Sequence, residues 1–372
     1  MGNKKIILGL VILLIGGAIF YFEAKKPERA TNIAADIAPR IASMTKAEKA
    51  ERYPLAKEII SPAGFVNTEP IKVADLIGAK VILVDFWTYS CINCQRTTPY
   101  LNAWYEKYQD QGLEILGIHT PEFEFEKKYE NVLAAVKKLK IKYPVIQDND
   151  YATWTAYQNR YWPRKYLIDI DGFIVYDHIG EGAYEETERK IQELLAERAI
   201  VLGTPETITT DVATPREAVS VNFSQVQSPE IYFGAARNEF LGHGVKQSLG
   251  LQTLPEPAEI NLNNLYLVGD WNFQREYAEN QSSNAKIIFR YQAKAVYLVA
   301  AAQGRLKVTV LLDGQPISAL SGADIKKTLN SSYFLVHEDR LYKIVEAEDY
   351  GEHTLELIIE NPGLKAFTFT FG

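Results

Sequence analysis

The stretch "VDFWTYSCINCQRTTPY", residues Val84 to Tyr100, contains both cysteines of the 372-residue chain, Cys91 and Cys94. The run "KVILVDFW", residues 80–87, leads into it and predicts a buried strand. After the cysteines, apolar and aromatic residues recur at helical spacing until "DQG", residues 110–112, ends the pattern. The two cysteines therefore stand where a strand gives way to a helix.

The spacing of the two cysteines suits chemistry between them. Positions i and i+3 lie on one face of a helix, so the two sulfur atoms can meet. Ser90 is the predicted N-cap residue, and the free N–H groups and positive dipole end at this point stabilise a thiolate. We expect Cys91, at the exposed end, to be the nucleophile and Cys94, one turn further, to resolve the mixed disulfide.

Other uses of a cysteine pair fit less well. A zinc site needs about four ligands, and this chain supplies two cysteines and five scattered histidines. Covalent haem attachment requires a histidine directly after the second cysteine, where Gln95 stands. A disulfide across so short a loop stabilises a fold little. A structural or accidental C-x-x-C is the alternative that the pattern leaves open.

The composition indicates a soluble, two-domain body. The chain is 47% hydrophobic and 23% charged, which are ordinary globular values, and its length accommodates two cores. A formal net charge of -7 supplies no basic surface for a phosphate backbone, so we expect no nucleic-acid partner.

The amino terminus departs from this composition. After Lys4 and Lys5, residues 6–22 carry no charge and, as a helix, would span roughly 25 Å, near the lower limit for crossing a bilayer. The run ends in aromatic residues without the small residues of a cleavage site, which favours an uncleaved anchor over a cleaved signal peptide. We therefore expect a membrane-anchored protein facing the periplasm or extracytoplasmic space. Disulfides in such compartments usually join distant segments, which Cys91 and Cys94 cannot do, so we expect the pair to be chemical rather than structural.

Two regimes follow each other along the body. From residue 63 to 203 predicted strands alternate with helices, which indicates an α/β domain with a parallel sheet. Beyond a Thr- and Pro-rich linker, 204–216, short strand patterns separated by turns predict an all-β sandwich of the jelly-roll type. The predicted division is an anchor over 1–26, a polar spacer over 27–62, the α/β domain over 63–203 and the β-sandwich with its linker over 204–372.

The cysteine segment resembles that of thioredoxin. In "VDFWTYSCINC" an aspartate, Asp85, stands six residues before the first cysteine, as in that family, and Pro99 matches the proline that kinks the helix. The resemblance implies that Asp85 is a buried acid that relays a proton near Cys94. It also places the family's cis-proline at Pro163 in "YWPRKYLID", for which a trans-proline starting a strand is the alternative.

A closer resemblance is to the extracytoplasmic, TlpA-like branch of redoxins, and within it to the C-terminal portion of the DipZ family. The signatures include "FWTYSCINCQRTTPYLNAWYEKY", "GIHTPEFEFEK" and "AFTFTFG", and they run from about Gly64 to Gly372. The resemblance implies a thiol-disulfide oxidoreductase with an appended carbohydrate-binding-module-like domain, using no cofactor beyond a redox-active Cys91–Cys94 disulfide. In place of the family's multi-helix CcdA-type membrane domain, this sequence has the single predicted anchor.

This resemblance also implies partners. Reduction of disulfides in envelope proteins, apocytochromes among them, is the favoured activity. Without its own membrane electron-transfer domain, the chain would take electrons from a separate donor of the CcdA/DsbD type. A glycan is the partner implied for the C-terminal domain, and exposed aromatic faces would favour one at Trp271, although a buried core tryptophan is the more usual situation.

Several residues near the cysteines have two readings each. Glu122 follows a predicted buried strand and is a candidate acid or base, with a solvated loop carboxylate as the alternative. Trp87 is a substrate platform or a packing residue, and Tyr89 gates the site or is a half-exposed aromatic. Trp162 is predicted to lie in the core or the groove wall.

Two rival functions stay open at this point. In one, the sandwich binds a glycan or a protein and the dithiol is vestigial. In the other, the chain is a thiol peroxidase, because redoxins share the fold. Peroxidases prefer a lone peroxidatic cysteine in a Thr-x-x-Cys context, which Thr88 and Ser90 do not provide.

Overall fold

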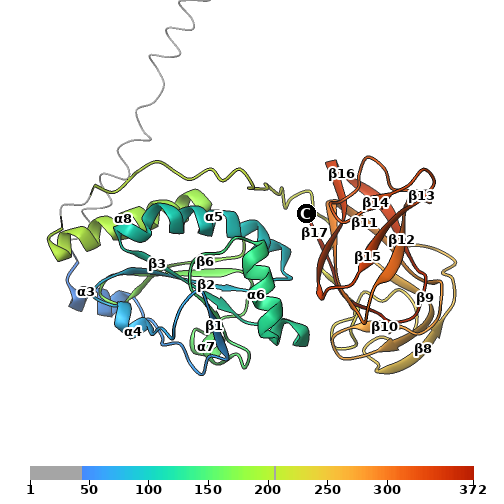
Figure 1. Cartoon of the computed structure of the whole chain (residues 1–372), viewed down its shortest axis with the longest axis horizontal. Helices are drawn as coiled ribbons and strands as arrows, with labels where there is room; N and C mark the ends of the chain where they lie inside the picture. Colours follow the sequence, from blue (N-terminus) through green and yellow to red (C-terminus); the bar gives the residue numbers. More distant parts are fainter. Residues whose placement is uncertain (1–43, 205–206) are drawn as a thin grey trace, which may run out of the picture.

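The computed structural model describes residues 44–204 and 207–372, and these form two halves joined by a long linker (Figure 1). The first half is a layered α/β unit, and the second contains strands only in its described part. The linker runs along α8 and α5 before it enters the second half. We call the two halves the redox domain and the β domain.

The redox domain follows the alternation that the sequence predicts. Its elements in chain order are α3 (Lys46–Arg52), β1 (Gly64–Val66), α4 (Val73–Leu76), β2 (Val81–Trp87), α5 (Ile92–Tyr108), η2 (Gln109–Gln111), β3 (Leu113–His119), η3 (Glu124–Lys127), α6 (Tyr129–Lys138), β4 (Val145–Gln147), α7 (Ala152–Ala156), β5 (Arg164–Ile168), β6 (Ile174–Ile179) and α8 (Tyr184–Leu202). The helix α8 ends at Gly203, which adopts the left-handed conformation that a helix C-terminus favours.

A six-stranded mixed sheet organises this domain. Its order is β1-β4-β3-β2-β5-β6, with β2, β3 and β4 parallel and β5 and β6 antiparallel at one side. Strand β2 is central, and all of its side chains are buried. Because side chains alternate along a strand, β2 contributes to cores on both faces of the sheet.

The two cores hold different helices. On one face, Leu83 and Trp87 of β2 pack in the buried cluster that includes Trp104 of α5 and Leu194 of α8. On the other face, residues 82, 84 and 86 pack in the cluster that contains Val73 of α4. The period of two therefore places Asp85 on the face that α5 covers.

Helix α3 belongs to the redox domain although its sequence is polar. Thr45 and Glu48 form a capping box at its start, and the side chain of Lys49 is 1% exposed. The next residues continue onto the sheet, where Leu55 bridges to Phe173. The spacer predicted over 27–62 is therefore folded against the domain from Lys46 onward, because buried carboxylates from distant segments attract Lys49.

The β domain is built on an eleven-stranded antiparallel sheet. The main path is β14-β15-β12-β16-β11-β17-β10-β9-β8, with β13 on β12 and β7 on β17. The strands are β7 (Ile231–Tyr232), β8 (Gly250–Leu254), β9 (Leu265–Phe273), β10 (Ala278–Asn280), β11 (Ala285–Ala302), β12 (Leu306–Leu312), β13 (Gln315–Pro316), β14 (Lys326–Lys327), β15 (Ser332–Val336), β16 (Arg340–Ile359) and β17 (Leu364–Phe371).

Strand β11 connects the two hydrophobic cores. Bulges at Ala293/Ala295 and Val296/Tyr297 shift its pairing with β16. From residue 295 onward, residues 296, 298 and 300 pack in the core of the β domain, whereas residues 295, 297, 299 and 301 belong to the buried cluster of the redox domain. The two domains therefore share apolar packing next to α5.

The predicted membrane anchor, 1–26, lies outside the described residues. In the part of the chain that the structure does describe, no helix combines the length and apolar character needed to cross a membrane.

Candidate active site

The two cysteines lie at the start of α5. Cys91 is the N-cap residue and Cys94 occupies the first turn, so that the backbone N–H of Cys94 donates to the Cys91 sulfur at 3.2 Å. Cys91 is partly exposed, whereas Cys94 is 2% exposed, and both are free thiols. A sulfur that accepts a backbone N–H at a helix start is favoured as a thiolate.

Ser90, which the sequence predicts as the N-cap, has a different role. Its hydroxyl donates to Glu126 Oε1 at 2.6 Å and its backbone N–H reaches the same oxygen at 3.2 Å. The other oxygen of Glu126 accepts the N–H groups of Glu122 and Phe123 at 2.6 and 3.0 Å. The buried carboxylate of Glu126 thus fastens the loop before Cys91 to the loop after β3.

Asp85 is buried on the central strand, on the side of α5. It is 2% exposed, and its Oδ1 has no hydrogen-bond partner among the described residues. Burial raises the pKa of Asp85 from 3.8 to about 7, against the opposing effect of the positive charge on Lys165. A carboxyl group with this pKa can hold or release a proton near neutral pH.

Lys165 is the buried cation beside this acid. It is directly opposite Asp85 in the antiparallel pair of β2 and β5, which puts both side chains on one face of the sheet. Its side chain is 0% exposed, and its ammonium group donates to the carbonyl of Gly180 at 3.1 Å. Burial lowers the pKa of Lys165, although the negative charge of Asp85 opposes this.

The same surroundings hold the second cysteine protonated. Burial raises the pKa of Cys94 well above its ordinary value, and the neighbouring thiol of Cys91 and the charge of Asp85 raise it further. Cys94 therefore needs a base before it can act as a nucleophile, and Asp85 is the buried carboxylate whose charge reaches it.

Pro163 stands directly before β5. The Trp162–Pro163 peptide bond is cis. The indole of Trp162 donates to the carbonyl of Thr120 at 3.0 Å, and its ring packs on Trp154 with centroids 4.3 Å apart. Trp162 is partly buried by these contacts.

The aromatic residues between strand and helix are buried. Trp87 is 2% exposed and packs edge-on against His119 at 5.1 Å, so that its ring belongs to the core. The ring of Tyr89 stacks on that of His119 with centroids 5.7 Å apart, and its hydroxyl donates to the carbonyl of Asp339 in the β domain at 3.1 Å. Burial lowers the pKa of His119 to about 3, so the imidazole that contacts both aromatic rings is neutral.

Glu122 faces the β domain. Its Oε1 accepts the hydroxyl of Tyr232 at 3.0 Å and pairs with the guanidinium of Arg237 at 2.8 Å. This carboxylate is thus engaged across the domain junction. The sequence alone makes Glu122 a candidate acid or base near the cysteines. It does not reveal the partner Arg237, which lies 115 positions away.

Three residues of the site were not predicted from the sequence: Lys165, Glu126 and Arg96. Lys165 could have been found, because period-two alternation puts it on the same face as Leu167 in an otherwise buried strand. In "EFEFEK" nothing separates Glu126 from its neighbouring glutamates. Arg96, one turn into α5, binds Glu181 at 2.6 Å and lies 6.0 Å from the ring centroid of Tyr297 in the β domain.

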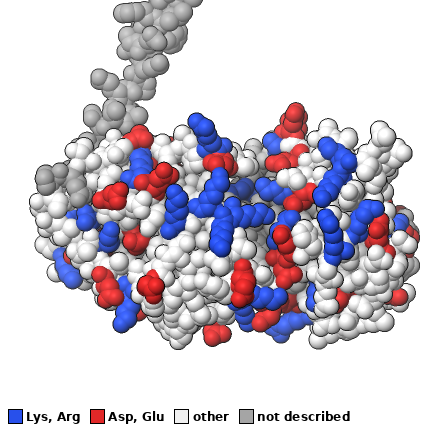
Figure 2. Space-filling model, viewed as in Figure 1, with Lys and Arg blue, Asp and Glu red and all other residues white. Residues whose placement is uncertain are grey.

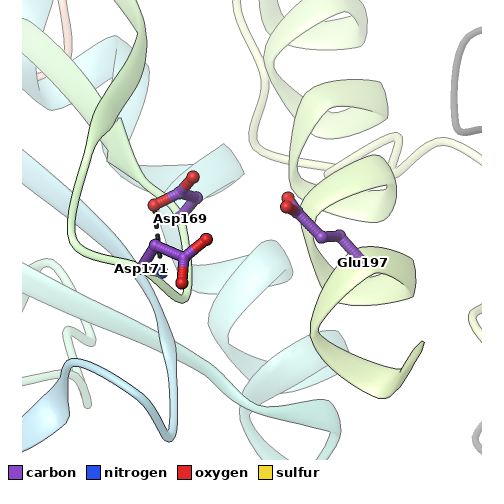
Figure 3. A group of neighbouring side chains, drawn as sticks. All are labelled: Asp169, Asp171 and Glu197. Atoms are coloured by element: carbon purple, nitrogen blue, oxygen red, sulfur yellow. Dashed lines mark hydrogen bonds between the residues drawn. The ribbon is translucent and has the colours of Figure 1, made fainter. Parts of the chain in front are cut away.

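A cluster of acids at another place resembles a metal site. Asp169 and Asp171, from the turn between β5 and β6, and Glu197 of α8 point toward one another (Figure 3), with oxygens within 4.8 Å. The ammonium group of Lys49 lies at 2.8, 2.7 and 2.5 Å from these carboxylates. Lys49 therefore supplies the positive charge, and we assign the cluster to the docking of α3.

Trp271 of β9 lies in the core of the β domain. It is 0% exposed and its indole donates to the carbonyl of Val268 at 3.0 Å. Trp271 is therefore a buried core residue, and its ring is not available to a glycan.

The site has the organisation of thioredoxin-like dithiol proteins: a reactive pair after the central strand β2, a buried acid on that strand, and a cis-proline directly before β5, which pairs with β2. Family models agree. Residues 57–177 match the AhpC/TSA family, and residues 228–372 match the family described as thioredoxin like C-terminal domain.

Comparison with curated proteins identifies the family. Thiol-disulfide oxidoreductase ResA of Bacillus cereus is 33% identical over 148 residues, 39% of this chain and 80% of that protein. The chain belongs to this family of thioredoxin-like thiol-disulfide oxidoreductases. Protein DipZ of Mycobacterium bovis is 38% identical over 322 residues, which are 85% of this chain but 43% of DipZ, so the chain spans less than half of that relative. The predicted resemblance to DipZ is confirmed.

Among solved structures, a thioredoxin-like protein in its oxidized form is 28% identical. It covers 39% of this chain and 97% of its own, with a TM-score of 0.36.

Proposed function

We propose that this protein is a thiol-disulfide oxidoreductase that reduces disulfides in other proteins through Cys91 and Cys94, with no cofactor beyond their redox-active disulfide. The observation that carries the proposal is the asymmetry of the pair. Cys91 is partly exposed and accepts an N–H group on its sulfur, whereas Cys94 is buried and beside a buried acid. One sulfur can reach a substrate, and the other can act only within the protein.

The first step is attack by Cys91. Its thiolate attacks one sulfur of the substrate disulfide, a bond forms between the two sulfurs, and the substrate S–S bond breaks. The other substrate sulfur leaves as a thiolate and takes a proton from water. The N–H of Cys94 stabilises the attacking thiolate before the reaction.

The second step is attack by Cys94. The carboxylate of Asp85 accepts the thiol proton, and the resulting thiolate attacks the Cys91 sulfur. The Cys91–Cys94 bond forms, the mixed disulfide breaks, and the second substrate sulfur leaves as a thiolate that takes a proton from water, while Asp85 returns its proton to water. The substrate has gained two electrons and the pair has lost two, so a thiol donor must reduce the pair before the next turnover.

Lys165 adjusts this proton transfer. Its positive charge lowers the pKa of Asp85 toward neutrality, which leaves a fraction of the carboxylate free to act as a base at pH 7. Without that charge, burial alone would hold the proton on Asp85 more firmly.

The test uses the 372-residue chain, reduced and freed of reductant, mixed with a peptide that contains an internal disulfide. We expect the peptide to be reduced, with one Cys91–Cys94 disulfide formed per peptide. Cys91→Ser should not react, and Cys94→Ser should accumulate a mixed disulfide at Cys91. Failure of the wild type to reduce any peptide disulfide, or faster consumption of hydrogen peroxide than of disulfide, would contradict the proposal.

The reducing direction has its own measurement. Equilibration of the pair in thiol buffers should give a reduction potential near or below roughly -250 mV. A potential near roughly -120 mV would make the protein an oxidant and reverse the proposed direction.

We also propose that the protein is anchored through residues 6–22, faces the extracytoplasmic space, and receives electrons from a membrane donor of the CcdA/DsbD type. The uncharged run in the sequence and the similarity to DipZ support this. Membrane fractionation and protease accessibility of intact cells test it, and a protein found in the soluble cytoplasm would contradict it.

The β domain is proposed to be a jelly-roll sandwich of the carbohydrate-binding-module type. Its antiparallel sheet and single large core support the sandwich, and the resemblance to DipZ proteins supports the type. A glycan ligand stays a prediction, to be checked by glycan-array binding, and it does not involve Trp271.

A further inference from the structure

A groove of about 540 Å³ runs along the outward face of α5, at the junction of the two domains. It starts at Ile92, the residue after Cys91, and continues along the helix as far as Gln109. The groove is also lined by Lys138 at the end of α6 and residues 139, 140 and 142 after it, by residues 215, 217 and 219, and by Lys343 of β16. The β domain and the segment before it thus help to line a groove that begins at Ile92, the residue that follows Cys91 in the chain.

The walls of this groove, which we call the basic groove, are mostly cationic. Five cations line it: Arg96, Lys138, Lys140, Lys142 and Lys343. Its two carboxylates are Glu106 and Glu217. Figure 2 shows blue side chains gathered over the hollow between the two halves of the molecule.

Three of these cations lack a carboxylate. Arg96 is neutralised by Glu181, and Lys140 lies 3.7 Å from Glu217. Within the described part of the chain, no ion pair involves the ammonium groups of Lys138, Lys142 and Lys343. This contrasts with the protein as a whole, whose net charge is -7. Positive charge is therefore concentrated in the groove along α5, against the overall balance.

The electrostatic surroundings of Lys138 agree with this. Burial lowers the pKa of Lys138, and the positive charges of Arg340 and Lys343 lower it further, whereas the negative charges of Asp324 and Glu338 act in the opposite direction. An anion in the groove would relieve this repulsion.

The shape of the groove suits a polypeptide. Its floor includes apolar side chains of α5 and its surroundings, among them Ile92, Pro99 and Leu139. Helix α5 has 17 residues and is therefore about 25 Å long, which corresponds to roughly seven residues of extended chain. A flat, evenly charged surface for a nucleic-acid backbone would lack such a floor.

We propose that the basic groove binds an extended, acidic segment of the protein whose disulfide is exchanged at Cys91. This assignment rests on the proposed function and names the class of substrate. Carboxylates of the segment pair with Lys138, Lys142 and Lys343, and its apolar side chains cover the floor. The charge complementarity raises the rate of encounter and orients the substrate disulfide toward Cys91.

The experiment compares two peptides of equal length with the same internal disulfide. One carries a seven-residue tail of glutamate and serine, and the other a tail of glutamine and serine. The second-order rate constant for reduction by the reduced 372-residue chain is measured for each peptide. Cysteine-free versions of both tails, labelled with a fluorophore, report binding by anisotropy in a separate measurement that needs no redox reaction.

We expect the acidic tail to bind, and its disulfide to react, about tenfold better than the neutral one at low salt, with the difference disappearing near 0.5 M salt. In the triple variant Lys138→Gln, Lys142→Gln and Lys343→Gln the ratio between the two tails should fall to about one. The matched control changes three exposed lysines outside the groove, Lys57, Lys72 and Lys326, to glutamine and should keep the ratio.

Each outcome decides the assignment. Equal binding of both tails, or a preference that survives in the groove variant, overturns it. Tighter binding of a single-stranded oligonucleotide than of the acidic tail overturns it in favour of another ligand class. Selective binding of the acidic tail without reduction of any peptide disulfide would support the groove and contradict the proposed function, so the two failures are distinguishable.

Discussion

Two lysines are buried in the redox domain, and their surroundings are opposite. Lys49 is 1% exposed and contacts three carboxylates, which raise its pKa despite burial. Lys165 is 0% exposed and has one carbonyl partner and one acid opposite it on the sheet, and burial lowers its pKa. The two lysines are therefore equally buried, but Lys49 is paired with three carboxylates, whereas the charge of Lys165 is only partly compensated.

The difference separates a structural site from a reactive one. An ion-pair cluster with an excess of acid fixes the protonation of its lysine and resists change. A buried lysine with incomplete compensation lies close to a change of protonation state, and so does the carboxyl group of Asp85 beside it. The reactive cysteines are near the second lysine.

The largest expected effect concerns stability. Lys49→Met leaves Asp169, Asp171 and Glu197 together without a cation and should lower the free energy of unfolding by about 3–5 kcal/mol. Lys165→Met replaces an incompletely paired ammonium by an apolar group of similar volume and should change it by less than about 1 kcal/mol. Urea unfolding of both variants at pH 7 measures this, and equal destabilisation would contradict the contrast. The thiol-disulfide exchange activity of Lys49→Met, measured per folded molecule, should equal that of the wild type.

The next effect is on the pH dependence of stability. The pKa of Asp85 is about 7 in the folded protein against 3.8 ordinarily, so between these values the folded state holds a proton that the unfolded state releases. The contribution of Asp85 to stability therefore falls as the pH rises from about 4 to about 7. Asparagine at this position cannot ionise. Between pH 4 and pH 8, the free energy of unfolding of Asp85→Asn should therefore rise by up to about 4 kcal/mol relative to that of the wild type.

Unfolding of both proteins across this pH range is the measurement. If the difference in the free energy of unfolding between variant and wild type stays constant with pH, Asp85 is ionised throughout this pH range. Its negative charge would then be fully compensated by the positive charge of Lys165.

Asp85→Asn should also slow resolution of the mixed disulfide at pH 7 by about a hundredfold, because Cys94 loses its base. Rapid-mixing experiments that follow release of the second substrate thiol measure this step. The exposed Asp75→Asn serves as the control and should resolve at the wild-type rate. Equal rates in all three proteins would exclude Asp85 as the base.

The smallest effect sharpens the role of Lys165. Removal of its positive charge in Lys165→Met should raise the pKa of Asp85, so the midpoint of the pH profile for resolution should move upward by about one unit from neutrality. Lys165→Arg keeps the charge and should keep the midpoint. A midpoint that does not move in Lys165→Met would show that the charge of Lys165 does not reach the proton-transfer step.

The sequence predicts what short-range patterns determine. Strand β2, helix α5 and the closing helix α8 follow from apolar periodicity and stop signals within a few residues. The places of Cys91 and Cys94 follow from the same patterns. These features depend on neighbours in the chain, so one sequence suffices.

What the sequence misses depends on partners far away in the chain. The burial of Lys49 requires Glu197, 148 positions later, and the orientation of Glu122 requires Arg237 in the other domain. The N-cap was misplaced by one residue because Ser90 prefers the buried Glu126, 36 positions away. Lys165 alone could have been recognised, from its place in an alternating strand.

The shared packing along β11 bears on how the molecule can be divided. Two family models match the two domains separately. However, residues 295, 297, 299 and 301 of the β domain belong to a hydrophobic core of the redox domain. Cutting the chain after Gly203 would leave an apolar face of the redox domain open to water, beside its active helix. Heat should therefore melt the two parts together, and grafting the redox domain onto another partner would require that surface to be redesigned.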